Sequence, residues 1–135
     1  MSLTAALYSY ITSQLSGTIG TRLYPVMLPE GATLPAVTYR VISGQSDEYT
    51  EGTTGTATTR VQFNIYSDTY AEAASVAEAL RLAFHQYRGT TGGVFFNSVN
   101  LEFKLDLYDN PKSGTDQTRY VFVMDFSITH SETAI

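Results

Sequence analysis

The chain has 135 residues, with 8 Lys and Arg against 13 Asp and Glu, so its formal net charge at pH 7 is −5. Nucleic-acid binding by phosphate neutralisation needs clustered basic residues, and this charge balance argues against it. Cysteine is absent, which excludes disulfides, thiolate metal sites and cysteine nucleophiles.

The size and polarity of the chain predict one domain with a surface of neutral polar groups. We expect residues 1–135 to fold as a single unit, because this length is typical of one domain. Charged residues make up only 16% of the chain, and Thr and Ser together fill 31 positions. Such a surface suits hydrogen-bonded contacts with other proteins. The N-terminus lacks the basic segment of a signal peptide and no apolar run is long enough to span a membrane, so we expect no membrane association.

The first predicted element is an amphipathic helix over Leu3–Ser16. Gly17 follows its last apolar position and can cap the helix in the left-handed conformation. The stretch from Leu23 to Pro35 contains three prolines, which remove amide donors, so it predicts an irregular connection. The helix prediction depends on apolar side chains that recur every three or four positions, at Leu3, Ala6, Leu7, Tyr10, Ile11 and Leu15.

Two predicted strands flank a polar segment in the middle of the chain. Ala36–Ser43 and Arg60–Ser67 both alternate with period two and contain β-branched and aromatic residues. Between them, Gly44–Thr59 is rich in Gly, Thr and Ser and has no apolar periodicity. We expect this segment to be either a long mobile loop or the splayed tip of a hairpin.

The second predicted helix begins after Ser67 and extends to Gly89. Ser67, Asp68 or Thr69 can accept from the first amides of this helix, and Thr69 with Glu72 has the spacing of a capping box. The small side chains on its apolar face indicate a close approach to a sheet. That face contains Tyr70, Ala73, Ala74, Ala77, Leu80, Phe84 and Tyr87.

The rest of the chain predicts β-structure. After a turn at Gly89–Gly93, Val94–Val99 predicts a short strand. Leu101–Leu107 and Tyr120–Ile128 alternate apolar and polar residues on either side of turn residues 109–114, and they predict a long antiparallel hairpin whose apolar side chains face the core. The fold class is therefore α+β, with two helices packed on a mainly antiparallel β-sheet and a long C-terminal β-hairpin.

Candidate catalytic groups are few. His85, near the end of the second helix, is expected to be partly exposed and to interact with the helix dipole, and His130 is expected to be solvated beyond the last strand. No G-x-S-x-G elbow occurs, so acyl transfer has no support. Paired carboxylates occur in the polar segment and on the polar side of the hairpin, where solvent keeps both members ionised. These are Asp47, Glu48, Glu102 and Asp106.

Metal and cofactor motifs are also missing. The calcium-loop spacing does not occur, and the glycine-rich stretches GTTGTATT and GTTGG lack the lysine of a phosphate-binding loop. Flexible turns explain these stretches better. We therefore expect no metal and no cofactor.

The chain has 10 Tyr and 7 Phe but no Trp. Tyr66 and Tyr108 fall on the polar sides of predicted strands, and Tyr24 and Tyr49 fall in predicted loops. Tyrosine is enriched at protein interfaces because it combines a rigid apolar ring with a hydrogen-bonding tip. Capping of the sheet edges explains these residues equally well, so both interpretations stay open.

Several short motifs occur in an order that resembles a known family. The motifs are Arg22–Pro25, Leu34–Tyr39, Arg60–Tyr66, Ser67–Ala73, Arg119–Tyr120 and Asp125–Phe126. Each is weakly specific alone. Their order, their spacing and the length of the chain, from about Leu3 to Ile128, resemble the tail-terminator or tail-completion proteins of long-tailed bacteriophages, which join the tail to the head.

The resemblance implies a non-enzymatic virion protein, assembled in the host cytoplasm, that forms a homohexameric ring on the head-proximal end of the tail tube. Such a ring ends tube polymerisation and contacts the major tail tube protein and the head-closure or connector protein. DNA passes through it without specific binding. A head-closure or neck adaptor protein is the alternative, and a small hydrolase or ligand-binding module that uses His85 is a further one.

The residues favoured for contacts with these partners lie in the polar segment Gly44–Thr59 and in the turn Asp109–Asp116. They are Asp47, Glu48, Tyr49, Glu51, Asp109 and Lys112.

Overall fold

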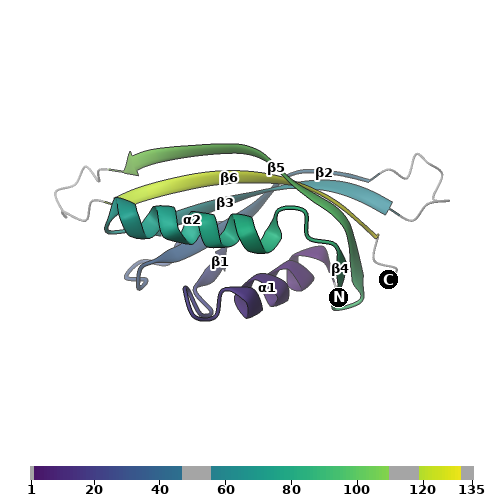
Figure 1. Ribbon diagram of the computed structural model, residues 1–135, viewed down its shortest axis with the longest axis horizontal. Coiled ribbons are helices and arrows are strands. Elements are labelled where there is room, and N and C mark those ends of the chain that lie inside the picture. Colours follow the sequence, from purple (N-terminus) through teal and green to yellow (C-terminus); the bar gives the residue numbers. More distant parts are fainter. Residues whose placement is uncertain (1, 47–55, 110–118, 132–135) are drawn as a thin grey trace.

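The computed structural model of the chain describes residues 2–46, 56–109 and 119–131. Within these ranges, two helices pack against one six-stranded sheet, which confirms the predicted α+β class (Figure 1). In chain order the elements are α1 (Leu3–Gln14), β1 (Leu23–Pro25), β2 (Ala36–Ser46), β3 (Thr56–Ser67), α2 (Tyr70–Phe84), β4 (Gly89–Thr91), β5 (Val94–Asp109) and β6 (Arg119–Ser131).

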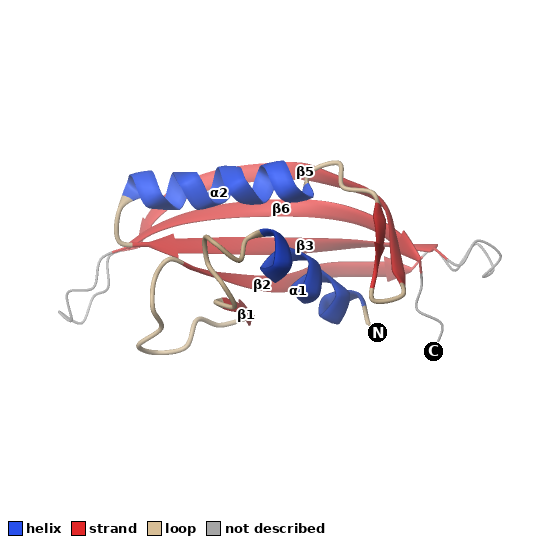
Figure 2. Cartoon of the chain, turned by 60° about the horizontal axis from the view of Figure 1, so that its bottom comes forward, coloured by secondary structure: helices blue, strands red, loops and turns tan. Residues whose placement is uncertain are grey.

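The sheet has the strand order β1-β2-β3-β6-β5-β4. All neighbouring strands are antiparallel except β1 and β2, which run parallel. Both helices lie on the same side of the sheet (Figure 2). α2 packs over β3 and β6, and α1 lies beside α2 and β4. The helices therefore cover only one of the two faces of the sheet.

Short strands occupy two stretches for which the sequence predicted irregular structure. Leu23–Pro25 pairs in parallel with Val37–Tyr39, and Gly89–Thr91 pairs with Val94–Phe96. Pro25 has no amide to donate, and a proline is tolerated here because β1 is an edge strand. The sequence missed both strands because each is only three residues long.

The polar segment Gly44–Thr59 connects two strands that extend into it. β2 continues to Ser46 and β3 begins at Thr56, with Ser46 paired to Ala57. Both ends of this segment are therefore paired strands, as expected for a hairpin and not for a long loop. Residues 47–55 lie outside the described residues.

Side-chain caps begin both helices. The Ser2 hydroxyl accepts from the Ala5 amide at 3.2 Å and the Thr69 hydroxyl accepts from the Glu72 amide at 3.2 Å, so Thr69 is the cap among the three candidates before α2. The Glu72 carboxylate does not return to Thr69 as in a full capping box. It accepts from the Ser67 hydroxyl at 2.7 Å, which fixes the turn between β3 and α2.

Both helices end before their predicted limits. The left-handed residue after α1 is Gly20, with φ of 59°, and not Gly17. α2 stops at Phe84, well before Gly89, because the Gln86 amide donates to the Val99 carbonyl of β5 at 2.6 Å. This bond connects the end of α2 to the sheet.

Aromatic rings form the centre of the core between the helices and the sheet. Phe84 of α2 packs against Phe126 of β6, with ring centroids 5.1 Å apart, and against Phe63 of β3 at 6.0 Å. Phe63 and Phe126 also meet edge to face at 5.6 Å. All three side chains are fully buried, and burial of each contributes roughly 1.5–3 kcal/mol to folding. These contacts hold α2 over the two central strands.

The two strands predicted at Val94–Val99 and Leu101–Leu107 form a single strand, β5, whose register with β6 is irregular at two places. Its pairing with β6 shifts between Phe96 and Ser98 and again between Leu101 and Phe103. A one-residue bulge moves all later side chains of a strand to the opposite face of the sheet. The second shift therefore reverses the orientation that the alternating pattern predicts for the rest of β5.

Candidate assembly surface

The side of the sheet opposite the helices is covered by no helix or strand in the described ranges (Figures 1 and 2). We call this side the open face. Residues that pair across neighbouring strands point to the same side, so the register identifies its members. Three successive rows across β5, β6, β3 and β2 are Leu107-Val121-Tyr66-Ala36, Leu105-Val123-Asn64-Thr38 and Phe103-Asp125-Gln62-Arg40.

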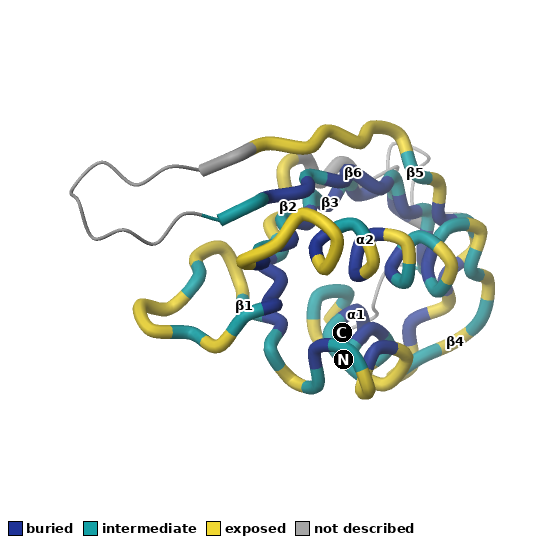
Figure 3. The backbone as a smooth tube through the Cα atoms, turned by 60° about the vertical axis from the view of Figure 1, so that its left-hand side comes forward, coloured by how far each residue is buried: buried dark blue, intermediate teal, exposed yellow. Residues whose placement is uncertain are grey.

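The β5 end of these rows is apolar and exposed. Phe103, Leu105 and Leu107 are 45%, 42% and 48% exposed, and we call these three residues the apolar ladder. Val121 and Val123 of β6 adjoin them and are more buried. Figure 3 shows the contrast between the exposed β5 and the buried β6. An exposed apolar row on a polar surface is typical of a protein interaction site.

The prediction that Leu101–Leu107 faces the core is wrong for the apolar ladder. Only Leu101 packs against the core, because it precedes the bulge. Glu102 has no partner on β6 and is the extra residue of the bulge. The period-two pattern continues through the bulge without a break, so the sequence carried no signal of the reversal.

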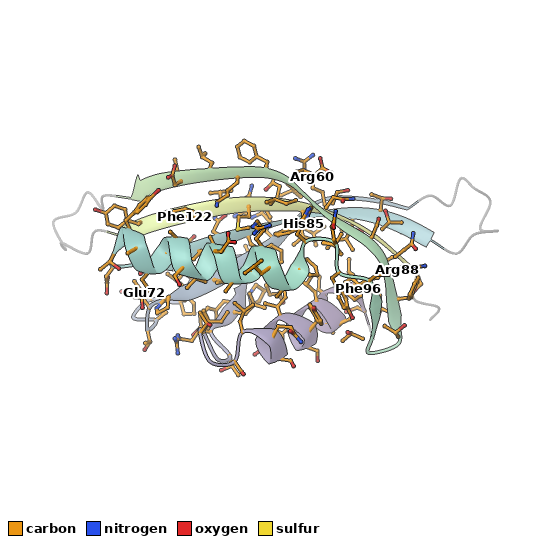
Figure 4. All side chains as sticks on the ribbon, viewed as in Figure 1. Arg60, Glu72, His85, Arg88, Phe96 and Phe122 are labelled. Atoms are coloured by element: carbon orange, nitrogen blue, oxygen red, sulfur yellow. The ribbon has the colours of Figure 1, made fainter. Side chains whose placement is uncertain are left out.

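The centre of the open face is polar. The Arg60 guanidinium lies 3.3 Å from the Asp125 carboxylate, which is only 7% exposed. Arg60 points away from the helices (Figure 4). Three buried atoms of this region, Asp125 Oδ1, Arg60 Nε and Asn64 Oδ1, have no hydrogen-bond partner among the described residues.

The tyrosines have mixed roles. Tyr66 is half-buried on the open face, and the Arg119 guanidinium lies 5.6 Å from its ring centroid. This cation–π contact supports the interpretation of Tyr66 as a residue that packs on the sheet. Tyr24, in β1, is also half-buried. Tyr49 and the side chain of Tyr108 lie outside the described parts.

Polar side chains of β5 lie on the helix side after the bulge. Asp106 accepts from the Tyr70 hydroxyl of α2 at 2.8 Å, and the Lys104 ammonium lies 5.7 Å from the Phe122 ring centroid. The hydrogen bond with Asp106 raises the pKa of Tyr70 above its usual value. Asp106 is exposed, as predicted, but it faces α2 and not the side away from the helices.

Neither histidine forms a catalytic arrangement with the groups it contacts. His85 is partly exposed, as predicted, and its Nδ1 atom accepts from the Leu101 amide at 3.1 Å. The prediction that His130 is solvated is wrong. His130 is 6% exposed in β6, with Nε2 at 2.9 Å from the Thr59 hydroxyl and Nδ1 at 2.8 Å from the Ser131 carbonyl. β6 extends beyond Ile128, so His130 belongs to the sheet.

Most of the residues predicted to contact partners lie outside the described ranges. These are Asp47, Glu48, Tyr49, Glu51 and Lys112. Asp109 is the last residue of β5 and pairs with Arg119, but the structure does not describe its side chain.

The two predicted contact segments are attached to opposite ends of the sheet. The β2–β3 connection leaves the sheet near the Thr56–Ser131 pair, and the β5–β6 connection leaves it near the Asp109–Arg119 pair. β6 runs from one end to the other over 13 residues, so the two attachment points lie roughly 40 Å apart. The attachment points of the two segments are therefore too far apart to belong to one site.

The described residues support neither a metal site nor a membrane-spanning helix. Within them, no group of three or more His, Asp and Glu side chains could hold a metal ion. In the same ranges, neither helix has the length and apolar character needed to cross a membrane.

Comparison with known proteins decides the family. The model of the family described as Tail completion protein gp17 matches residues 2–131. The chain belongs to this family. A search among curated proteins gave no match. Family membership confirms the resemblance found in the sequence, and it makes this chain a structural protein of the phage tail and a component of the virion.

A solved structure has the same fold. A chain from the structure "Virion of native gene transfer agent (GTA) particle" superposes with a TM-score of 0.66 and 17% sequence identity, over 96% of each chain. At this identity the likeness concerns the fold alone.

Proposed function

We propose that this protein caps the head-proximal end of the phage tail tube, ends tube polymerisation and joins the tail to the head connector. The observation that carries the proposal is the match to the tail completion family over residues 2–131. We propose further that it acts without catalysis, as a homohexameric ring. Its partners are the major tail tube protein on one side and the head-closure or connector protein on the other.

The open face supports a role in assembly. The apolar ladder is exposed on an isolated copy, and a virion component has neighbouring proteins available to cover it. The chain also has few charges, and charged residues are depleted in the centres of protein interfaces. With a net charge of −5 per copy, a ring would attract DNA phosphates only weakly, which suits a channel through which DNA passes.

The two ends of the sheet suit two different partners. We propose that Asp47, Glu48, Tyr49 and Glu51 contact one partner and that Asp109 and Lys112 contact the other. The attachment points of these segments at opposite ends of β6 support this division. A protein that lies between tube and connector needs contact groups on opposite sides.

Removal of the protein from assembling particles tests the function. We expect particles made without it to have tails of irregular length that are not joined to heads, as seen by electron microscopy, and the wild-type protein should restore them. Tails of normal length joined to heads in its absence would disprove the proposed function.

The open face is tested with a polar variant of the ladder. Leu105→Thr combined with Leu107→Thr should leave the subunit folded but should abolish restoration of joined particles. Met27→Thr is the matched control, because Met27 is 71% exposed and lies outside the sheet, in the connection between β1 and β2. Equal restoration by both variants would show that the ladder has no role in assembly.

Separate binding assays with tube protein and with connector distinguish the proposed function from the alternative of a neck adaptor. A tail-capping protein binds tube ends in the absence of the connector, whereas an adaptor binds the connector first. His85→Ala should leave particle assembly unchanged, because the contact of its ring with the Leu101 amide is structural. Loss of an enzymatic activity in that variant would instead favour the hydrolase alternative.

A further inference from the structure

The outer edge of β5 has no neighbouring strand over much of its length. β4 pairs only with Val94–Phe96, and the residues that end α2 supply partners for the Val99 carbonyl and the Leu101 amide. Along residues 103–109, no described strand lies on the outer side of β5. In an antiparallel strand, every second residue directs its amide and carbonyl to that side. Residues 103–109 therefore form a free edge of the sheet.

Side-chain exposure agrees with a free edge on β5. Every residue from Glu102 to Leu107 is exposed, although successive side chains point to opposite sides of the sheet. A layer over one face could therefore cover only half of them, whereas a further strand beside β5 would contact both sets. A long edge strand with exposed apolar side chains, such as the apolar ladder, is a template for pairing with another chain.

The other edge of the sheet is also free over part of its length. β1 pairs only with Val37–Tyr39 of β2, so residues 40–46 have no described strand on their outer side. Val41 and Ile42 in this stretch are 45% and 39% exposed. One copy thus has two free edges of equal length, on opposite sides of the sheet (Figure 2).

The two free edges have complementary directions and positions. β2 and β5 run in opposite directions, because each neighbouring pair from β2 through β3 and β6 to β5 is antiparallel. When two copies stand side by side with their open faces on the same side, the β2 edge of one meets the β5 edge of the next in antiparallel orientation. β1 and β4 block the remaining lengths of the edges, so the overlap is limited to residues 40–46 and 103–109.

We propose that residues 40–46 of one copy pair with residues 103–109 of the next copy, so that successive copies form one continuous antiparallel sheet. A single kind of contact then fills both free edges of every copy, whereas pairing of β5 with β5 leaves the β2 edges free. Contacts between two different edges repeat, and they form a ring when the rotation between copies closes. The closed ring rests on the proposed function, whereas the pairing rests on the edges themselves.

The stagger between copies agrees with a closed ring. Arg40 lies in the same row as Asp125 of β6, whereas Asp109 pairs with Arg119 of β6. Alignment of residue 40 with residue 109 of the next copy therefore shifts that copy along the strands by roughly 20 Å. Each copy adds β2, β3, β6 and β5 to the sheet, a width of about 19 Å. These dimensions tilt the strands by about 45°, the upper end of the range for closed β-barrels.

Engineered cysteines test the pairing in finished particles, because the chain has no cysteine. Arg40→Cys and Leu107→Cys each place a thiol on the open face, one at each free edge. In the proposed pairing these positions are diagonal neighbours on adjacent copies, about 7–8 Å apart, whereas within one copy they are roughly 20 Å apart. A short bismaleimide that spans only the first distance should yield dimers and higher multiples of the subunit under denaturing conditions.

Single variants and a displaced pair provide the controls. Particles with only Arg40→Cys or only Leu107→Cys should yield monomers, and particles with a mixture of these two chains should yield dimers and nothing larger. Arg40→Cys combined with Thr90→Cys should yield monomers, because Thr90 is exposed but lies in β4, beside the other end of β5. Dimers from Leu107→Cys alone would overturn the proposal in favour of pairing between two β5 edges.

Hydrogen exchange tests the pairing without any substitution. Amides on the outer side of residues 40–46 and 103–109 should exchange much more slowly in wild-type particles than in the dissociated subunit, because the neighbouring copy accepts their hydrogen bonds. Equally fast exchange in both samples would overturn the pairing, whether or not the cysteine variants assemble.

The remaining outcomes also decide. Only monomers from the double variant at positions 40 and 107, in particles with normally joined tails, would overturn the pairing but leave the proposed function intact. Slow exchange without subunit dimers would overturn it in favour of strands from the tube or connector protein. Absence of the wild-type chain from finished particles would refute the proposed function, and cross-linking of the double variant in solution would then decide the pairing.

Discussion

His130 is held in one tautomer by its neighbours. The Ser131 carbonyl can only accept, so His130 Nδ1 carries the proton, and in the neutral ring Nε2 accepts from the Thr59 hydroxyl. Both residues are buried between β3 and β6. The pair joins the ends of these strands, close to the β2–β3 connection, and has a structural role.

Removal of the hydroxyl tests this role. Thr59→Val keeps the shape of the side chain but leaves Nε2 of His130 buried without a donor, so we expect the free energy of unfolding to fall by about 1–3 kcal/mol. Urea denaturation measures the change. Thr90→Val is the control, because Thr90 is an exposed strand residue, and its effect should be about 0.5 kcal/mol or less. Equal stability of the two variants would contradict the role of the hydrogen bond.

The contact between Tyr70 and Asp106 predicts a change in titration. Asp106→Asn removes the carboxylate, which accepts a hydrogen bond from the phenol and whose charge disfavours its ionisation, so the pKa of Tyr70 should fall toward 10.0, as measured by NMR of ¹³C-labelled tyrosine. Because the wild-type pKa is raised in the folded state, the contact stabilises the fold below the pKa of the unfolded chain. That contribution is lost as the pH rises through the folded pKa. Glu30→Gln should leave the titration unchanged.

At the scale of elements, the bulge in β5 determines what the open face presents. Before it, Val99 and Leu101 face the helices and pack in the core. After it, the apolar residues face away from the helices, and Lys104 and Asp106 take the helix side. A single extra residue thereby moves three apolar side chains from the core to the surface.

Deletion of Glu102 should reverse this arrangement. Without the extra residue, Leu105 moves to the helix side, so the nuclear Overhauser contacts between its methyl groups and those of Val123 should disappear. The Tyr70–Asp106 hydrogen bond should be lost as well, and joined particles should no longer form. Glu102→Gln keeps the length of β5 and should preserve the contacts. Their persistence in the deletion variant would show that the register is set elsewhere.

At the scale of the whole molecule, exposed apolar surface is distributed unevenly over the two sides of the sheet. The helices shield one face of the sheet, and the other face carries the exposed apolar ladder. The sheet ends carry the two hairpin connections at separate locations. The apolar ladder and the two connections therefore lie at separate places on the subunit.

The sequence by itself determined the α+β class, the approximate positions of the long strands and the N-terminal cap of α2, because alternation and capping are local properties. The order of its motifs also indicated the family. The tertiary structure decided which side of the sheet each part of β5 faces, that His130 is buried, and that the two contact segments are far apart. Periodicity records that neighbouring side chains alternate, but a bulge arises from pairing with β6, a strand distant in the sequence. The apolar ladder therefore became visible only when that pairing was known.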